Sequence, residues 1–138
     1  MTNKSLNKKI IEVFKIYDNY WNTKNIEKWS DLFTNNVDFV IKRGVRIKSK
    51  EVLLRVHKRI MEGFSEIGQN MNHHTKVEEI EMLSKNIVLV SAIWEWPEFI
   101  PSPNANTISY FNGVSTVIIE KNDDLWLIRA MHSSVNPK

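Results

Sequence analysis

The sequence predicts an α+β fold, in which helices near the start of the chain cover one face of a curved antiparallel β-sheet. Apolar residues recur at three- and four-residue steps early in the chain and alternate with period two over most of the rest. Short connections join the successive predicted strands, which favours an antiparallel meander. The last three strands are each about a dozen residues long. Strands of that length usually curl, so the sheet should have an inside.

Length and composition set the outer limits of this prediction. The chain has 138 residues, 42% of them apolar and 25% charged, which predicts one globular domain over residues 1–138. The absence of cysteine excludes disulfides, thiolate catalysis and cysteine-based metal sites. No apolar run approaches the ~20 residues of a membrane span, and the N-terminus lacks the apolar stretch of a signal peptide. We therefore expect a cytoplasmic protein with no membrane partner.

A basic cluster gives the chain much of its net charge of +3. Between Lys42 and Arg59 there are eight lysines and arginines and one opposing acid, Glu51. Such a cluster can bind nucleic acid, but a solvated turn and helix face is the simpler interpretation. No Phe, Tyr or Trp lies within the cluster, so the stacking platform that single-stranded nucleic acid requires is missing. We expect no nucleic-acid partner.

Three helices are predicted in the first half of the chain. An apolar stripe predicts a helix from about residue 5 to 23, with Leu6, Ile10, Val13, Tyr17, Tyr20 and Trp21 as its members. Asn25 is the expected N-cap of a short second helix. Residues 37–41 alternate as a strand. Ser49 is the expected N-cap of a third helix that runs to about Gly63.

The remainder of the chain has the pattern of a sheet. We place strands at 71–83, 87–98, 107–120 and 125–135, with an irregular proline-containing loop at 99–106. Both faces of the 87–98 strand are apolar, with Val88, Val90, Ala92, Trp94 and Trp96 opposing Ile87, Leu89 and Ile93. Helices can cover only one face. Burial of the other against a second copy of the chain, in a homodimer, is the simplest solution.

Several short segments carry a family resemblance. They are, in chain order, Tyr20-Trp21, Trp29, Leu32-Phe33, Asn36–Val40, Glu81–Leu83, Ile87–Val90, Gly113–Ile119, Leu125–Ile128 and Met131–Ser134. In this order and spacing they resemble the SnoaL-like proteins of the NTF2-like superfamily, and most closely its SgcJ/EcaC (DUF4440-type) group. The likeness covers about Ile10 to Val135. It implies an NTF2-like, cystatin-like cone, often dimeric, in which three N-terminal helices pack on a strongly curved antiparallel sheet with a pocket at the open end.

The expected pocket suits a small, largely apolar or aromatic molecule, because aromatic side chains with a few polar groups line such cone interiors. We expect contacts from eight side chains, namely Tyr20, Trp21, Trp29, Phe39, Trp94, Trp96, Tyr110 and His132. Each of the aromatic residues could equally be ordinary core. No cofactor is expected.

His132 is the strongest single candidate for catalysis. By alternation it shares a face with Ile128, so it should project from the last strand toward apolar surroundings, where a histidine can act as general acid or base. Asp38 and Glu95 are the assisting candidates, although Asp38 alternates with the apolar residues around it. The alternative to catalysis is that the histidine is structural and hydrogen-bonded and that the carboxylates are solvated strand residues.

The other histidines are expected to be less informative. His73 and His74 are adjacent, so an extended strand points them to opposite faces and they cannot both reach one site without a bulge. We expect no metal centre. His57, within the third helix, is expected to be solvated or to lie between helices.

Three functions fit these expectations. The first is a small-molecule binding protein with an aromatic-lined pocket. The second is a SnoaL-type enzyme, an isomerase, cyclase, dehydratase or hydrolase, that performs acid/base catalysis in the same pocket with His132 central and Asp38, Tyr20 or Glu95 assisting. The third is an interaction scaffold that docks another protein on the exposed sheet face. The superfamily that the chain resembles contains both enzymes and proteins that only bind, so the resemblance does not choose among them.

Overall fold

The computed structural model describes residues 3–41, 44–101 and 109–136. Within them lie three helices and six strands, in the order α1 (Asn3–Asn22), α2 (Ile26–Ser30), β1 (Phe33–Val40), β2 (Arg46–Ile47), α3 (Lys50–Glu66), β3 (His74–Ser84), β4 (Ile87–Phe99), β5 (Ser109–Asn122) and β6 (Leu125–Val135). The predicted order of elements is confirmed. Asn25 and Ser49 cap α2 and α3 as expected, because their side chains accept hydrogen bonds from the backbone N–H groups of Lys28 and Val52. Most of the predicted 99–106 loop lies outside the described residues.

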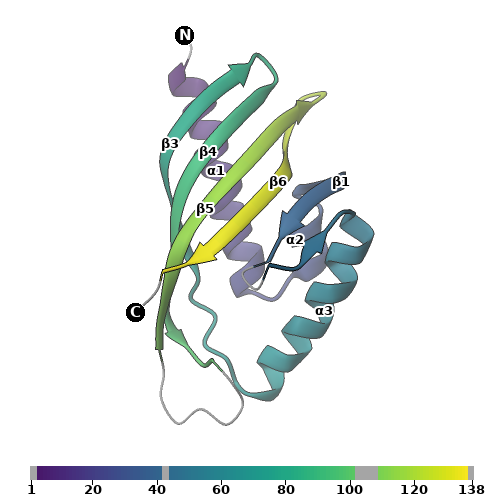
Figure 1. The fold of residues 1–138 in the computed structure, drawn as a ribbon, viewed down its shortest axis with the longest axis vertical. Coiled ribbons are helices and arrows are strands. Elements are labelled where there is room, and N and C mark those ends of the chain that lie inside the picture. Colours follow the sequence, from purple (N-terminus) through teal and green to yellow (C-terminus); the bar gives the residue numbers. More distant parts are fainter. Residues whose placement is uncertain (1–2, 42–43, 102–108, 137–138) are drawn as a thin grey trace.

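The strands form one six-stranded sheet in the order β2-β1-β6-β5-β4-β3. Strands β3 to β6 are the predicted antiparallel meander. The sheet is not antiparallel throughout, since β1 pairs in parallel with its neighbour β6. The other neighbour of β1, β2, pairs with it in the antiparallel direction. The long strands bend along α1, and α3 lies beside the β1–β2 end (Figure 1). This arrangement encloses the inner face of the sheet.

The core joins the apolar stripe of α1 to the inner face of the sheet. Ile10, Phe14 and Tyr17 of α1 are buried against it. The inner face of β4 and β5 is built from register pairs such as Val88 with Ile119 and Val90 with Val117, all of them fully buried. The face of β4 that contains Trp94 and Trp96 is therefore the inner one. No helix within the described residues is both long enough and apolar enough to cross a membrane.

A β-bulge in β6 changes which residues face the core. Ile118 pairs with Ala130 and the next residue, Ile119, pairs with Ile128, so Arg129 is an extra residue in the ladder. Ile128 and Met131 are consequently both buried, three positions apart, where an unbroken strand would place them on opposite faces. His132 follows Met131 and is exposed on the outer face.

Candidate active site

A cavity of about 550 Å³ lies between the inner face of the sheet and the helices. Its lining is mainly aromatic, and its polar members include two histidines, a threonine and two serines; the main side chains are Tyr17, Trp21, Trp29, Phe39, His57, Phe64, His73, Thr75, Trp94, Trp96, Phe99, Phe111, Ser115, Met131 and Ser133. The volume and the lining are typical of sites that enclose a small organic molecule.

Five of the eight side chains expected at the pocket line this cavity, and they are Trp21, Trp29, Phe39, Trp94 and Trp96. Tyr20 instead packs at the edge of the core from the flank of the α1 stripe. Tyr110 is 53% exposed, because its neighbour Phe111 is the residue of β5 that faces inward. His132 lies on the outer face because of the bulge at Arg129. The expectation that His132 projects into the pocket is thus corrected.

The carboxylates expected to assist catalysis also lie on the outer face. Asp38 is in register with Ala130, and its oxygens lie 3.1 Å from Nε of Arg46 and 3.3 Å from Nζ of Lys48. Glu95 accepts a 2.7 Å hydrogen bond from the Tyr110 hydroxyl, and this bond raises the pKa of the tyrosine. Both carboxylates have partners near solvent, outside the cavity.

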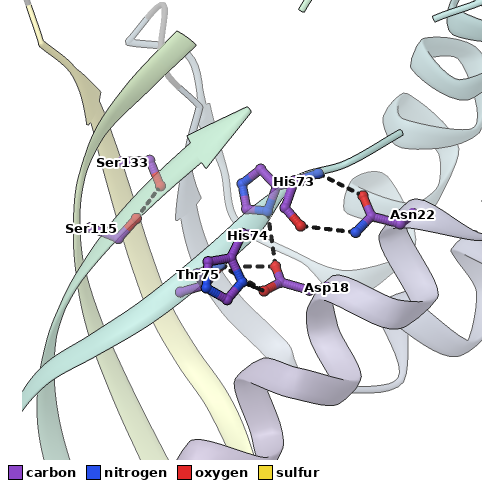
Figure 2. Close-up of polar contacts among 7 residues, drawn as sticks. All are labelled: Asp18, Asn22, His73, His74, Thr75, Ser115 and Ser133. Atoms are coloured by element: carbon purple, nitrogen blue, oxygen red, sulfur yellow. Dashed lines mark hydrogen bonds and ion pairs between the residues drawn. The ribbon is translucent and has the colours of Figure 1, made fainter. Parts of the chain in front are cut away.

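The histidine of the cavity wall that has an acidic partner is His73, whose ring is hydrogen-bonded to Asp18 of α1, behind the wall (Figure 2). Nδ1 of His73 lies 2.9 Å from Oδ1 of Asp18, and the two side chains are only 7% and 13% exposed. A carboxylate only accepts, so Nδ1 carries the proton and the neutral ring has its lone pair on Nε2. This is the arrangement by which a carboxylate fixes the tautomer of a catalytic histidine.

Backbone and side-chain hydrogen bonds fix both members of the pair. The Thr75 backbone N–H donates to Oδ2 of Asp18 at 2.7 Å, and the Thr75 hydroxyl donates to Oδ1 at 2.9 Å. One turn along α1, the Asn22 side chain bonds the His73 backbone twice, donating to its carbonyl at 2.8 Å and accepting from its N–H at 2.9 Å. The start of β3 is thereby held against α1 (Figure 2).

His74 points away from the cavity, as the alternation predicted. Its side chain is 68% exposed, and its Nδ1 lies 4.0 Å from the Asp18 carboxylate. Across the described residues, no three histidine, aspartate or glutamate side chains are grouped in a way that could hold a metal ion.

Aromatic rings hold the His73 imidazole in the cavity wall. The ring stacks on Trp94 at an interplanar angle of 12°, with 5.8 Å between centroids, and meets the edge of Trp96 at 90°. The position of Trp94 depends on Gly113, its register partner on β5. A Cβ at Gly113 would lie 1.7 Å from the Ser134 carbonyl oxygen and 2.8 Å from Cζ2 of Trp94. Only glycine fits between these two groups.

Tyr17 brings a hydroxyl to the same wall. Its ring lies 6.1 Å from His73, and it precedes Asp18 in α1. Burial, reinforced by the neighbouring Asp18 carboxylate, raises the pKa of the Tyr17 phenol well above its usual range. The hydroxyl therefore stays protonated to a higher pH than that of an ordinary tyrosine, and it can act as a hydrogen-bond donor.

His57 is a second histidine in the cavity lining. It is buried in α3 against Trp21 of α1 and Trp29 of α2, so of the two expected positions the one between helices is confirmed and the solvated one is wrong. Its Nδ1 lies 2.8 Å from the Leu53 carbonyl oxygen, which only accepts, so Nδ1 carries a proton here too. The ring packs 4.8 Å from Trp29 and 5.4 Å from Phe39.

Two serines form the polar part of the sheet wall. Ser115 of β5 and Ser133 of β6 are register partners, and their hydroxyl oxygens lie 2.8 Å apart (Figure 2). Both line the cavity, and Ser115 is 4% exposed. We refer to these residues as the serine pair.

Sequence reasoning missed the His73–Asp18 pair and the serine pair, although weak signals exist for both. Asp18 lies four residues after Phe14 and three before Trp21, at the edge of the apolar stripe of α1. Ser115 shares its alternation with Val117, so a hydroxyl was identifiable on the inner face of β5. The contact between Asp18 and His73 spans 55 positions and has no local signature.

Comparison with known proteins identifies the fold. No protein-family model and no curated protein matches the chain. Solved structures match over nearly its whole length. A candidate scytalone dehydratase from Novosphingobium aromaticivorans has a TM-score of 0.83 at 12% identity, over 98% of this chain and 87% of that one. A ketosteroid isomerase-like protein from Erwinia carotovora atroseptica has a TM-score of 0.79 at 12% identity, over 95% and 96%.

A third similar structure is that of an NTF-2 like protein. It is a protein of unknown function from Shewanella oneidensis, with a TM-score of 0.76 at 21% identity, over 93% of this chain and 98% of that one. A protein with a cystatin-like fold from Caulobacter vibrioides also matches, with a TM-score of 0.74. The chain therefore has the NTF2-like, cystatin-like α+β fold.

Proposed function

We propose that this protein binds a small, mostly apolar, ring-containing molecule in the cavity and transfers a proton on it through His73. The observation that carries the proposal is the His73–Asp18 pair, in which a histidine in the aromatic wall of a cavity of about 550 Å³ is hydrogen-bonded to a carboxylate behind that wall. An aromatic lining favours a flat or cyclic ligand. A tautomer fixed by a buried carboxylate favours acid/base chemistry over binding alone.

The proposed proton transfer follows from the chemistry of the pair. His73 accepts a proton from the ligand at Nε2, while Nδ1–H stays bonded to Asp18, whose negative charge stabilises the imidazolium that forms. The imidazolium can then return the proton to another ligand atom. Tyr17, whose hydroxyl is protonated at neutral pH as in any tyrosine, can donate a hydrogen bond to a ligand oxygen on which charge develops.

The fold neighbours are compatible with this class of reaction. Two of them are named as a dehydratase and as an isomerase-like protein, and both names denote reactions that move protons on organic molecules. The similarity of this chain to them is one of fold only. The grouping with SgcJ/EcaC proteins and the cytoplasmic location stay predictions from the sequence.

The test begins with a panel of small ring alcohols and ketones, screened for binding by protein-observed NMR. Bound compounds are then followed in D2O for exchange of carbon-bound hydrogen and for loss of water. We expect His73→Gln to retain binding and to lower turnover by about 10²- to 10⁴-fold, the usual contribution of a positioned acid/base group. Asp18→Asn should also lower turnover, because an amide can present its N–H to Nδ1 and disturb the tautomer.

His132→Gln is the matched control, because it makes the same substitution on the outer face. It should leave turnover unchanged. Equal turnover by wild type and His73→Gln would overturn the catalytic proposal. Binding with no turnover by the wild type would leave a binding protein, and no binding by any member of the panel would overturn both parts.

A second proposal concerns the outer face of the sheet. We propose that a second copy of the chain covers it, because Ile93, Val114 and Tyr110 lie 39%, 47% and 53% exposed on adjacent strands. Light scattering should then give a mass near twice 16.2 kDa, and Val114→Glu should reduce it to that of one chain. A monomer at micromolar concentration would contradict the homodimer and would favour a scaffold that docks another protein there.

A further inference from the structure

We propose that the serine pair, Ser115 with Ser133, is a recognition site for an oxygen substituent of the ligand, separate from the atom on which His73 acts. The inference rests on the proposed function, because it assigns a second polar contact to the same bound molecule. It narrows the ligand to cyclic or aromatic molecules that carry oxygen substituents at two separated positions.

The hydrogen-bonding capacity of the pair supports this role. Each hydroxyl has one donor and two acceptor positions, and the 2.8 Å contact between the two uses one donor and one acceptor. It is the one hydrogen bond of these hydroxyls among the described residues. One O–H donor and several lone pairs therefore remain at the wall of the cavity. A ligand hydroxyl or carbonyl oxygen can use them.

The surroundings of the pair make a purely structural role a poor explanation. The next inward residues along the two strands are Val117 and Met131, both buried and apolar. Replacing both partners of a buried hydrogen bond by apolar groups costs little or even stabilises a protein. The fold would therefore accept aliphatic side chains at both positions.

The position of the pair sets the spacing of the two ligand groups. Trp94, on which His73 stacks, pairs with Gly113 across the sheet. Ser115 is the next residue of β5 on the same face, about 7 Å farther along the strand. A ring system lying on this wall can thus have one substituent at the His73 side and another at the serine pair.

The test uses three probes of one shape, namely naphthalene, 2-naphthol and 2,6-dihydroxynaphthalene, with binding measured by isothermal titration calorimetry. We expect the wild type to bind the diol about fivefold more tightly than 2-naphthol, as one added hydrogen bond predicts. The double variant Ser115→Ala, Ser133→Ala should lose this preference and bind naphthalene as the wild type does. The control Thr116→Ala, Ser134→Ala removes hydroxyls from the next residues, which are exposed on the outer face, and should keep the preference.

The outcomes separate the two proposals. A preference for the diol that survives in the double serine variant, or disappears in the control, overturns the role of the serine pair and leaves the proposed function standing. An equal loss of affinity for all three probes in the double variant shows a change of shape and also overturns it. Failure of the wild type to bind any of the three overturns the proposed function, and this inference with it.

Discussion

The two faces of the same sheet carry similar residue types in opposite environments. At the inner face, the His73 imidazole lines an aromatic cavity and is hydrogen-bonded to Asp18 of α1, and both side chains are almost wholly buried. On the outer face, His132 is exposed, and Asp38 is paired with two basic side chains that are themselves more than half exposed. Exposed charge pairs such as that of Asp38 contribute little to the free energy of unfolding. Removing one partner of a buried pair is strongly destabilising, because the other partner is left buried without a hydrogen bond.

This difference teaches that the face of the sheet, more than the residue type, decides what a titratable side chain can do. His132, on the outer face, is in contact with water. His73, beside Trp94 and Trp96, has a fixed tautomer and a low-dielectric surrounding, which strengthens its interaction with a charge nearby.

The largest expected effect comes from the two aspartates. Asp18→Ala should lower the free energy of unfolding by about 3 kcal/mol, because it leaves the partly buried Thr75 N–H and the Nδ1–H of His73 without the carboxylate that accepts from them. Asp38→Ala should lower it by less than about 1 kcal/mol. Urea denaturation followed by circular dichroism measures both. An equal loss of unfolding free energy in the two variants would contradict the expectation that the buried Asp18 contributes more to stability than Asp38.

Two glycines give the next contrast. Gly113→Ala should cost about 2 kcal/mol, because the added methyl collides with the Ser134 backbone and the Trp94 ring, and the sheet must shift to admit it. Gly63, in the last turn of α3, has nothing within 4 Å of its missing Cβ, so Gly63→Ala should stabilise the chain by about 0.5–1 kcal/mol. Thermal unfolding of both variants tests the pair, and a neutral Gly113→Ala would contradict the close packing around Trp94.

Tyr17 should make stability fall in alkali. Its pKa is raised on folding above the unfolded value of 10.0, so its contribution is full below pH 10.0, declines as the pH rises past that value, and is lost once the folded pKa is passed. The slope should be about 1.4 kcal/mol per pH unit. Tyr17→Phe should flatten this part of the stability curve. If the free energy of unfolding falls as steeply with pH in Tyr17→Phe as in the wild type, groups other than Tyr17 cause the loss of stability in alkali.

The sequence was sufficient for the architecture because periodicity and capping are local. The stripe from Ile10 to Trp21, the caps at Asn25 and Ser49, and the alternation of β4 all depend on neighbours a few residues away. The parallel pairing of β1 with β6 was missed, since it joins the two ends of the chain. The His73–Asp18 pair was missed for the same reason.

The placement of His132 failed for a different physical reason. Counting by twos from Ile128 puts His132 on the inner face, but the extra residue at Arg129 reverses the phase of everything after it. Neither the composition of this strand nor its apolar content reveals the bulge. The same shift turns Ser133 toward the cavity. The bulge is thus the reason why His132 lies outside the cavity and why Ser133 is part of the serine pair.

The smallest expected effect tests this phase shift directly. His132→Ala should change the free energy of unfolding by no more than about 0.5 kcal/mol, because an exposed side chain on a central strand has little to lose. Met131→Ala, one residue earlier, removes a buried side chain from the cavity wall and should cost at least about 2 kcal/mol. Chemical denaturation of the two variants measures the contrast. In a strand without the bulge, His132 would face the core and Met131 the solvent. A large loss of stability in His132→Ala together with no loss in Met131→Ala would therefore contradict the bulge at Arg129.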